Sequence, residues 1–200
     1  MENTLKNKGK IKIVALDFDG VITNLNVDWN YAIRLASKIV GYNIKSLLTF
    51  YETSHATSTF YLVSEEIEKL ELEALKNAKP APFLKEFLDK ILKAHVKMYL
   101  VSMQSAYAVE NFLKRHNIAR CFKEALTREK FPSKKAQLKY ILNCLEAKSE
   151  EVLLVDDSKR NIAQCKELGI ECFYFEKNQD LVAIKKAWDR IREIVNGDAL

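Results

Sequence analysis

Two aspartates stand one residue apart directly after an apolar run, in the stretch IVALDFDGVIT at residues 13–23. The run IVAL predicts a strand buried on both faces, so Asp17 and Asp19 follow its carboxyl end. In an extended segment, residues two apart project to the same side, so both carboxylates can face one site. A single DxD pair is common by chance, and its partners elsewhere in the chain decide whether it carries chemistry.

Other polar groups follow other predicted strands or begin a helix. They are Ser102 after HVKMYLVS, Lys134 or Lys135 at the start of a helical pattern, and Asp156 with Asp157 ending EVLLVDD. The carboxyl ends of parallel strands share one edge of a sheet, so these groups are expected to meet. Clustered carboxylates repel one another unless some are protonated or a cation lies among them. Hard oxygen ligands without a nearby His or Cys favour Mg²⁺.

The elements that must position these groups alternate between strands and helices. Short apolar runs predict strands at 11–16, 95–102, 124–126, 151–157 and 170–175. Strands that alternate with helices predict an α/β fold with a doubly wound parallel sheet and helices on both faces. Gly169 lies directly before the last of these strands and is expected to end a helix there.

Helical periodicity predicts apolar faces on three segments after residue 80. These faces are Phe83, Leu84, Phe87, Leu88, Ile91 and Leu92; Leu138, Ile141, Leu142 and Leu145; and Leu181, Ile184, Trp188, Ile191 and Val195. The last face is expected to pack on the sheet, with a dimer contact as the alternative.

Residues 24–79 break the alternation, because no convincing strand occurs there and the pattern is helical. The residues Trp29, Ile33, Ala36 and Val40 share one helical face that ends at Gly41, and Ser64 is expected to cap a later helix. The KPAP stretch at 79–82 marks the return to the α/β pattern. We therefore expect a core of residues 1–23 and 80–200, with an all-helical cap inserted at 24–79.

The four motifs, in this order, resemble those of the haloacid dehalogenase-like hydrolase superfamily. DFDGVIT, MYLVS ending in Ser102, a lysine about thirty residues later and VLLVDDSKRNI carry the resemblance, which extends from Ile11 to Phe175. The insertion after the first motif is similar to the small helical (C1-type) cap of the phosphatase branch. Dehalogenases of the superfamily lack the second aspartate, which is present here as Asp19.

The resemblance implies that Asp17 is a nucleophile that forms an aspartyl-phosphate. It implies that Asp19 protonates the leaving oxygen and later deprotonates water, which requires a raised pKa. Gly20 would let the backbone pass close to the phosphate. In the family's second motif, the Ser102 hydroxyl and the following backbone N–H, that of Met103, hold a phosphate oxygen.

The third-motif lysine neutralises charge on the phosphoryl group and on Asp17. Lys134 aligns best with the family pattern, but Lys135 stands where the family commonly has proline, so both stay open. The resemblance implies that Mg²⁺ is bound by Asp17, by Asp157 with help from Asp156, and by the backbone carbonyl of Asp19. Asn161 replaces a further aspartate and is expected to give only a supporting hydrogen bond.

The cap is expected to cover the site and to contact the part of the substrate beyond the phosphate. Its candidate specificity residues are Asp28, Trp29, Arg34, Tyr51 and His55. Its modest size favours a small phosphorylated metabolite, such as a sugar phosphate, phosphoglycolate or a nucleotide, over a protein or nucleic acid.

Composition is that of an ordinary globular protein of 200 residues with a net charge of +5. The basic residues are scattered, which argues against a nucleic-acid partner. No segment approaches the roughly 18 apolar residues of a membrane span. Four cysteines without a CxxC pair are expected to be buried free thiols in a reducing cytoplasm. The expected state is a monomer or a homodimer.

The leading hypothesis is a Mg²⁺-dependent phosphatase that hydrolyses a small phosphate monoester through an aspartyl-phosphate. One alternative is a phosphomutase that transfers the same phosphoryl group to a sugar hydroxyl instead of water. Another is a regulatory module that binds a phosphorylated ligand without turning it over. The intact pair of Asp17 and Asp19 argues against the last.

Overall fold

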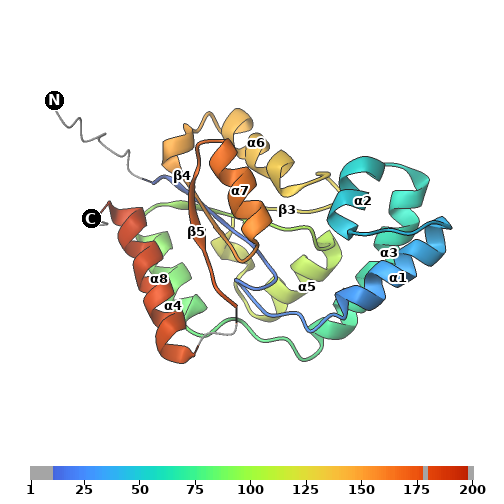
Figure 1. Cartoon of the computed structure of the whole chain (residues 1–200). Coiled ribbons are helices and arrows are strands. Elements are labelled where there is room, and N and C mark those ends of the chain that lie inside the picture. The colour runs from blue at the N-terminus through green and yellow to red at the C-terminus, as the bar shows by residue number, and fades with distance from the viewer. Residues whose placement is uncertain (1–10, 178–179, 198–200) are drawn as a thin grey trace.

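The computed structural model describes residues 11–177 and 180–197 of the chain. Within these ranges, five parallel strands form one sheet in the order β3-β2-β1-β4-β5 (Figure 1). The strands are β1 (Ile13–Leu16), β2 (Lys97–Val101), β3 (Glu124–Leu126), β4 (Val152–Asp156) and β5 (Glu171–Tyr174). The predicted parallel sheet is confirmed, and all five strands lie within the expected runs.

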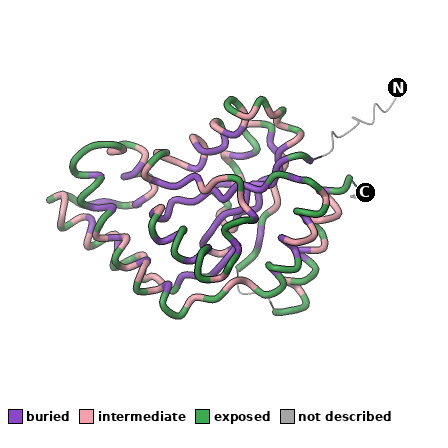
Figure 2. The backbone as a smooth tube through the Cα atoms, turned by 180° about the vertical axis from the view of Figure 1, so that it is seen from behind, coloured by how far each residue is buried: buried purple, intermediate pink, exposed green. Residues whose placement is uncertain are grey.

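Helices cover both faces of the sheet, as the alternation of elements predicted. They are α4 (Leu84–Lys93), α5 (Ala106–Arg115), α6 (Lys134–Cys144), α7 (Lys159–Glu167) and α8 (Leu181–Asn196), with 3₁₀ turns at Ala119–Cys121 and Ser149–Glu151. Along β1, Val14 and Leu16 pack in the cluster with α4, α5 and α8, whereas Ile13 and Ala15 pack with α6 and α7. The central strands β1, β2 and β4 are therefore buried on two sides, and Figure 2 shows the buried segments concentrated in the middle of the molecule.

Three helices stand between β1 and α4 and form the expected helical insertion. They are α1 (Trp29–Val40), α2 (Leu47–Ser54) and α3 (Ser58–Leu75). These three helices lie together on one side of the molecule, on the right in Figure 1. They share a core of their own that includes Phe50, Phe60 and Ile67. We call α1, α2 and α3 the cap. Its exact limits at 23/24 and 79/80 stay a prediction.

Two expected helix ends are confirmed and one is wrong. Gly41, with φ of 79°, caps α1, and Gly169, with φ of 71°, follows α7. Ser64 does not cap a helix but lies buried inside α3, whose cap is Thr57. The Ser/Thr-rich stretch before Phe60 offers several hydroxyls that can cap a helix, and Thr57 accepts the hydrogen bond from the Phe60 N–H at 3.1 Å.

The expected apolar faces also need correction at their ends. Phe83 is 37% exposed because it precedes α4 with a left-handed backbone, and Leu92 is 38% exposed. Leu181, in the first turn of α8, is 61% exposed, whereas Trp188, Ile191 and Val195 are buried against the sheet layer. A periodic pattern marks the middle of a helix better than its ends, where the chain turns away from the core.

The cysteines do not match the expected four buried thiols. Cys165 of α7 and Cys172 of β5 are paired in a disulfide, and Cys144 is an exposed free thiol. Cys121 is buried and free, as expected. In the described ranges, none of the helices is both long and apolar enough to cross a membrane.

Candidate active site

The polar residues that follow the strands meet at one edge of the sheet. One carboxylate oxygen from each of Asp17, Asp156 and Asp157 lies within 4.8 Å of the others. Asp17 directly follows β1, where its backbone N–H donates to Val155 of β4 at 2.9 Å. Asp156 is the last residue of β4. The ends of two adjacent parallel strands thus bring the three carboxylates together.

A buried lysine reaches this carboxylate cluster. Lys134 Nζ lies 2.7 Å from Asp17 Oδ1 and 3.3 Å from Asp156 Oδ2, and it also donates to the Val101 carbonyl at 2.6 Å. Burial alone would lower the pKa of Lys134, but Asp17 and Asp156 outweigh burial and raise it. Lys135 points away and pairs with Glu167. Of the two candidate lysines, the structure therefore places only Lys134 in the site, as a cation.

Burial and the neighbouring Asp156 raise the pKa of Asp17 from its ordinary 3.8 to about 7, although Lys134 opposes the shift. A nucleophilic carboxylate must be ionised. A divalent cation among these oxygens would favour the charged form of Asp17. The donor set therefore fits Mg²⁺: it consists of carboxylate oxygens and carries an excess of negative charge.

This shift predicts how the stability of the metal-free protein depends on pH. Between pH 3.8 and about 7, folded Asp17 holds a proton that the unfolded chain has released, so the free energy of unfolding falls as pH rises. We expect a fall of about 1 kcal/mol per pH unit between roughly pH 5 and 7, measured by urea denaturation in EDTA. Saturating Mg²⁺ and the Asp17→Asn substitution should each flatten this slope. A slope that is unchanged in Asp17→Asn would contradict the assignment.

Asp19 lies beside the carboxylate cluster but is not part of it. Its Oδ1 accepts the Leu25 N–H at 2.8 Å, and the Trp29 side chain also hydrogen-bonds the carboxylate. Burial raises the pKa of Asp19, with Lys177 and these hydrogen bonds opposing the shift. The raised pKa is the property that a general acid requires. Any contribution of Asp19 to a metal would come from its backbone carbonyl.

The turn after β4 holds Asp156 in place. Asp156 Oδ1 accepts the Ser158 N–H at 2.8 Å, and Asn161 Nδ2 donates to both carboxylate oxygens at 3.0 and 3.1 Å. Asn161 gives the supporting hydrogen bonds that its sequence position predicted. Asp157 projects from the same turn with its side chain 9% exposed, within reach of a ligand.

Gly20 permits the close approach of two loops at the site. It has φ of +87°, and a Cβ there would lie 2.1 Å from Asp157 Oδ2 and 2.4 Å from the Lys177 side chain. Any larger residue would displace the expected metal ligand Asp157. The group that the Gly20 backbone approaches closely is therefore the Asp157 side chain.

Lys177 is a site residue that the sequence analysis missed. It follows β5, and its Nζ lies 2.6 Å from Asp157 Oδ2 and 3.9 Å from Asp19 Oδ2. The strand-end rule used for the other strands would have found it. Because Lys177 occupies one oxygen of Asp157, a cation that binds there must compete with this ammonium.

Ser102 directly follows β2 but is fully buried. Its hydroxyl pairs with the Gln104 side chain and accepts the Gln104 N–H at 3.1 Å. The Ser102 carbonyl accepts from Gln137 Nε2 at 2.6 Å. Met103 and Gln104, the two residues after Ser102, line the cavity described below. In this structure the serine hydroxyl therefore organises the loop, and the cavity wall is formed by its neighbours.

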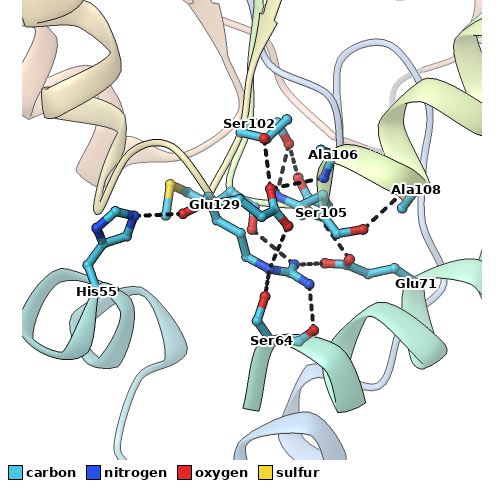
Figure 3. Close-up of polar contacts among 12 residues, drawn as sticks. His55, Ser64, Glu71, Ser102, Ser105, Ala106, Ala108 and Glu129 are labelled. Atoms are coloured by element: carbon cyan, nitrogen blue, oxygen red, sulfur yellow. Dashed lines mark hydrogen bonds and ion pairs between the residues drawn. The ribbon is translucent and has the colours of Figure 1, made fainter. Parts of the chain in front are cut away.

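A buried ion pair joins the cap to the loops around the site (Figure 3). Arg128, which follows β3, donates to Glu71 of α3 at 2.5 Å, and both side chains are almost completely buried. The same guanidinium donates to the Ser64 hydroxyl at 2.7 Å and to the Met103 carbonyl at 3.3 Å. Glu71 accepts the Ser105 N–H at 3.1 Å. The pair thus holds the segment of Ser102 to Ser105 against the cap.

Two features of the sequence indicate that these residues are buried and charged. Glu71 occupies a position on the apolar face of α3, four residues from both Ile67 and Leu75. Arg128 follows a predicted strand end, like the other site residues. A charged side chain at a core position is rarely buried unless a side chain of opposite charge pairs with it.

A cavity of about 320 Å³ lies between the cap and the carboxyl ends of the strands. Among the expected specificity residues, Trp29 and Tyr51 line it. The other three have structural contacts: Asp28 caps α1, Arg34 lies over the Tyr31 ring, and His55 Nε2 lies 3.1 Å from the Arg128 carbonyl. The site therefore has a charged floor from the core and a roof from the cap.

The model of one protein family, described as haloacid dehalogenase-like hydrolase, matches residues 14–175. The chain belongs to this haloacid dehalogenase-like hydrolase family. The expected family and enzyme class are thereby confirmed. The match includes both the strand ends that hold the acids and the helices inserted between them.

Curated relatives of this haloacid dehalogenase-like hydrolase include phosphoglycolate phosphatases. That of Vibrio parahaemolyticus is 26% identical over 188 aligned positions, and the match covers 82% of each chain. That of Aliivibrio fischeri is 24% identical over 194 aligned positions, and the match covers 82% of this chain and 83% of the other. These relatives are phosphatases, in agreement with the expected branch.

Solved structures share the fold of this haloacid dehalogenase-like hydrolase. A crystal structure described as a predicted phosphatase from Clostridium acetobutylicum has a TM-score of 0.68 at 12% identity, covering 92% of this chain and all of the other. One described as a predicted phosphoglycolate phosphatase from Haemophilus somnus has a TM-score of 0.65 at 18% identity, covering 93% and 98%. At these identities the likeness establishes the fold alone.

Proposed function

We propose that the chain is a Mg²⁺-dependent phosphatase that hydrolyses a small phosphate monoester through an aspartyl-phosphate on Asp17. The observation that carries this proposal is the placement of the Asp17 carboxylate: it contacts the buried cation Lys134 and adjoins Asp156 and Asp157. It also lines a cavity large enough for a small ester. The phosphatases among the curated relatives support the same reaction class.

In the proposed reaction, an Asp17 carboxylate oxygen attacks phosphorus while the bond from phosphorus to the ester oxygen breaks. Asp19 gives its proton to the leaving oxygen, so the alcohol departs neutral. Water then attacks the phosphoryl group on Asp17, Asp19 takes a proton from that water, and phosphate is released. Lys134 balances the negative charge on Asp17 and the phosphoryl oxygens.

Mg²⁺ held by Asp17, Asp157 and the Asp19 carbonyl, with Asp156 assisting, would act as a Lewis acid toward a phosphoryl oxygen. The segment of Ser102 to Ser105, named the phosphate loop for this proposed role, would supply the Met103 N–H. It would also supply the Ser102 hydroxyl once that hydroxyl has rotated away from Gln104. Gly20 would keep the two loops close enough for these groups to converge on one phosphate. These assignments retain the roles that the family resemblance implies.

Metal removal tests the proposal directly. We expect p-nitrophenyl phosphate hydrolysis to vanish in EDTA and to return with Mg²⁺ but not with Ca²⁺. The same assay should be run with a panel of phosphate esters that includes phosphoglycolate, because the names of the curated relatives give it as their substrate. Product analysis with a sugar phosphate separates hydrolysis, which releases inorganic phosphate, from a mutase reaction, which returns an isomeric ester. Full activity in EDTA would overturn the metal assignment.

A further inference from the structure

The cavity has two chemically different ends. Its floor is charged, with Asp17, Asp19, Lys134, Asp157 and Lys177. Its roof consists mainly of apolar side chains from the first two cap helices: Trp29 and Ile33 of α1, and Leu47, Leu48 and Tyr51 of α2. A phosphoryl group that reaches Asp17 must therefore leave the rest of its ester against the apolar roof.

The polar groups of the roof are already engaged within the protein. The Ser46 hydroxyl accepts the Thr49 N–H at 3.3 Å and caps α2. The two Glu71 oxygens accept from Arg128 and Ser105, and the Trp29 side chain hydrogen-bonds Asp19. The remaining charged residue from the cap that lines the cavity is Lys45, which is exposed. Few groups remain to hydrogen-bond the hydroxyls of a sugar or polyol.

Tyr51 does not supply the missing hydrogen bonds. Its hydroxyl is buried and has no hydrogen-bond partner among the described residues, while its ring lies 5.5 Å from the Arg128 guanidinium. Because that hydroxyl is shielded, Tyr51 lines the cavity with the carbon atoms of its side chain. A ligand hydroxyl placed against the apolar side chains of the roof would lose its hydrogen bonds to water without gaining a partner, which weakens binding.

We propose that the ester handled by this site carries an apolar organic group, alkyl or aryl, packed between α1 and α2 of the cap. This inference rests on the proposed function for the phosphate end of the ligand. It assigns specificity to Ile33, Leu48 and the Trp29 ring. The proposed ester differs from a phosphate ester of glycolate or of a polyol, in which the group beyond the phosphate is polar.

A homologous series of ligands tests the proposal. Each methylene that enters an apolar wall contributes binding equal to about a four-fold change in Kd. We expect Kd for methyl-, ethyl-, propyl- and butylphosphonate, measured by calorimetry with Mg²⁺, to fall about four-fold per added methylene. In turnover, propyl phosphate should exceed the similarly sized phosphoglycolate in kcat/KM by at least ten-fold.

Ile33 and Ile39 offer a matched pair of variants. Both lie on α1 and are partly buried in the cap core, but only Ile33 lines the cavity. Ile33→Thr is expected to reduce the gain per methylene to about two-fold or less. Ile39→Thr should keep the wild-type series, and its melting temperature shows how much a threonine costs the helix itself.

The outcomes separate this inference from the proposed function. Binding that tightens with chain length, without turnover of any ester, would support the apolar site and overturn the phosphatase. Turnover with a flat phosphonate series, or with phosphoglycolate preferred to propyl phosphate, would overturn the apolar group and leave the phosphatase intact. An equal loss in Ile33→Thr and Ile39→Thr would overturn the assignment of specificity to the roof.

Discussion

Replacing Asp17 with asparagine is expected to lower kcat for phosphate-ester hydrolysis by about 10⁴-fold or more, because the amide cannot form the aspartyl-phosphate. The variant should still fold, because burial disfavours the charged form of the Asp17 carboxyl group and raises its pKa to about 7. The neutral amide does not carry that cost of burial. Acid-quenched wild-type enzyme should carry one phosphoryl group on the peptide that contains Asp17. The measurements are steady-state kinetics with Mg²⁺ and mass spectrometry of the quenched peptide.

Two comparison variants define the result for Asp17. Asp19→Asn is expected to lower kcat by about 10²- to 10⁴-fold, because it removes proton transfer but leaves the nucleophile. Asp189→Asn makes the same chemical change on the outer side of α8, where the largely exposed carboxylate pairs with Arg192, and should keep wild-type activity. Substantial activity in Asp17→Asn, or a phosphoryl group on another peptide, would refute the nucleophile assignment.

Removing the charge of Glu71 is expected to cost about 3 kcal/mol of folding stability, because the buried Arg128 would lose its close counter-ion and keep only Glu129, 3.8 Å away. Burial raises the pKa of Glu71, with Arg128 opposing, so the pair itself is costly to desolvate. Glu71→Gln should also raise KM, since the Ser105 N–H loses its charged acceptor and the phosphate loop its anchor. Urea denaturation and steady-state kinetics measure the two effects separately.

The control is Glu73→Gln on the same helix, whose carboxylate pairs with Lys76 at the surface. An exposed pair contributes roughly 0–1 kcal/mol, so little change is expected. The double variant Glu71→Leu with Arg128→Met removes both charges and should recover much of the stability. Its KM should stay high, because the anchor of the loop is absent. Recovery of both properties would show that the pair only stabilises the fold.

The sequence was sufficient to predict the sheet, for a physical reason. Parallel strands buried on two sides have uninterrupted apolar sequences, and IVAL, MYLV and VLLV have no competing helical pattern. The residues that follow those strands were predicted to meet because topology alone brings strand ends to one edge. That prediction needed no knowledge of side-chain contacts, and the geometry of Asp17, Lys134 and Asp157 agrees with it.

Two of the features that were missed depend on contacts between residues distant in sequence. Arg128 and Glu71 are 57 residues apart, and no local pattern pairs them. Ser64 was expected to cap a helix because local patterns favour serine before acidic residues, but it lies inside α3 and accepts a hydrogen bond from Arg128 instead. The pairing of Cys165 with Cys172 has another cause: the two cysteines are seven residues apart, and the approach of α7 to β5 brings them together.

The position of Met103 has a consequence for how such caps can be exchanged between proteins. Met103 belongs to the phosphate loop of the core, yet its side chain packs in the hydrophobic cluster of the cap, and its carbonyl accepts from Arg128. A chimera that received only a foreign segment at 24–79 would lose Glu71 and Ser64 while keeping Arg128 and Met103. Such a chimera would also need the foreign protein's residues at positions 103 and 128. The cap and these two core loops must therefore be exchanged together.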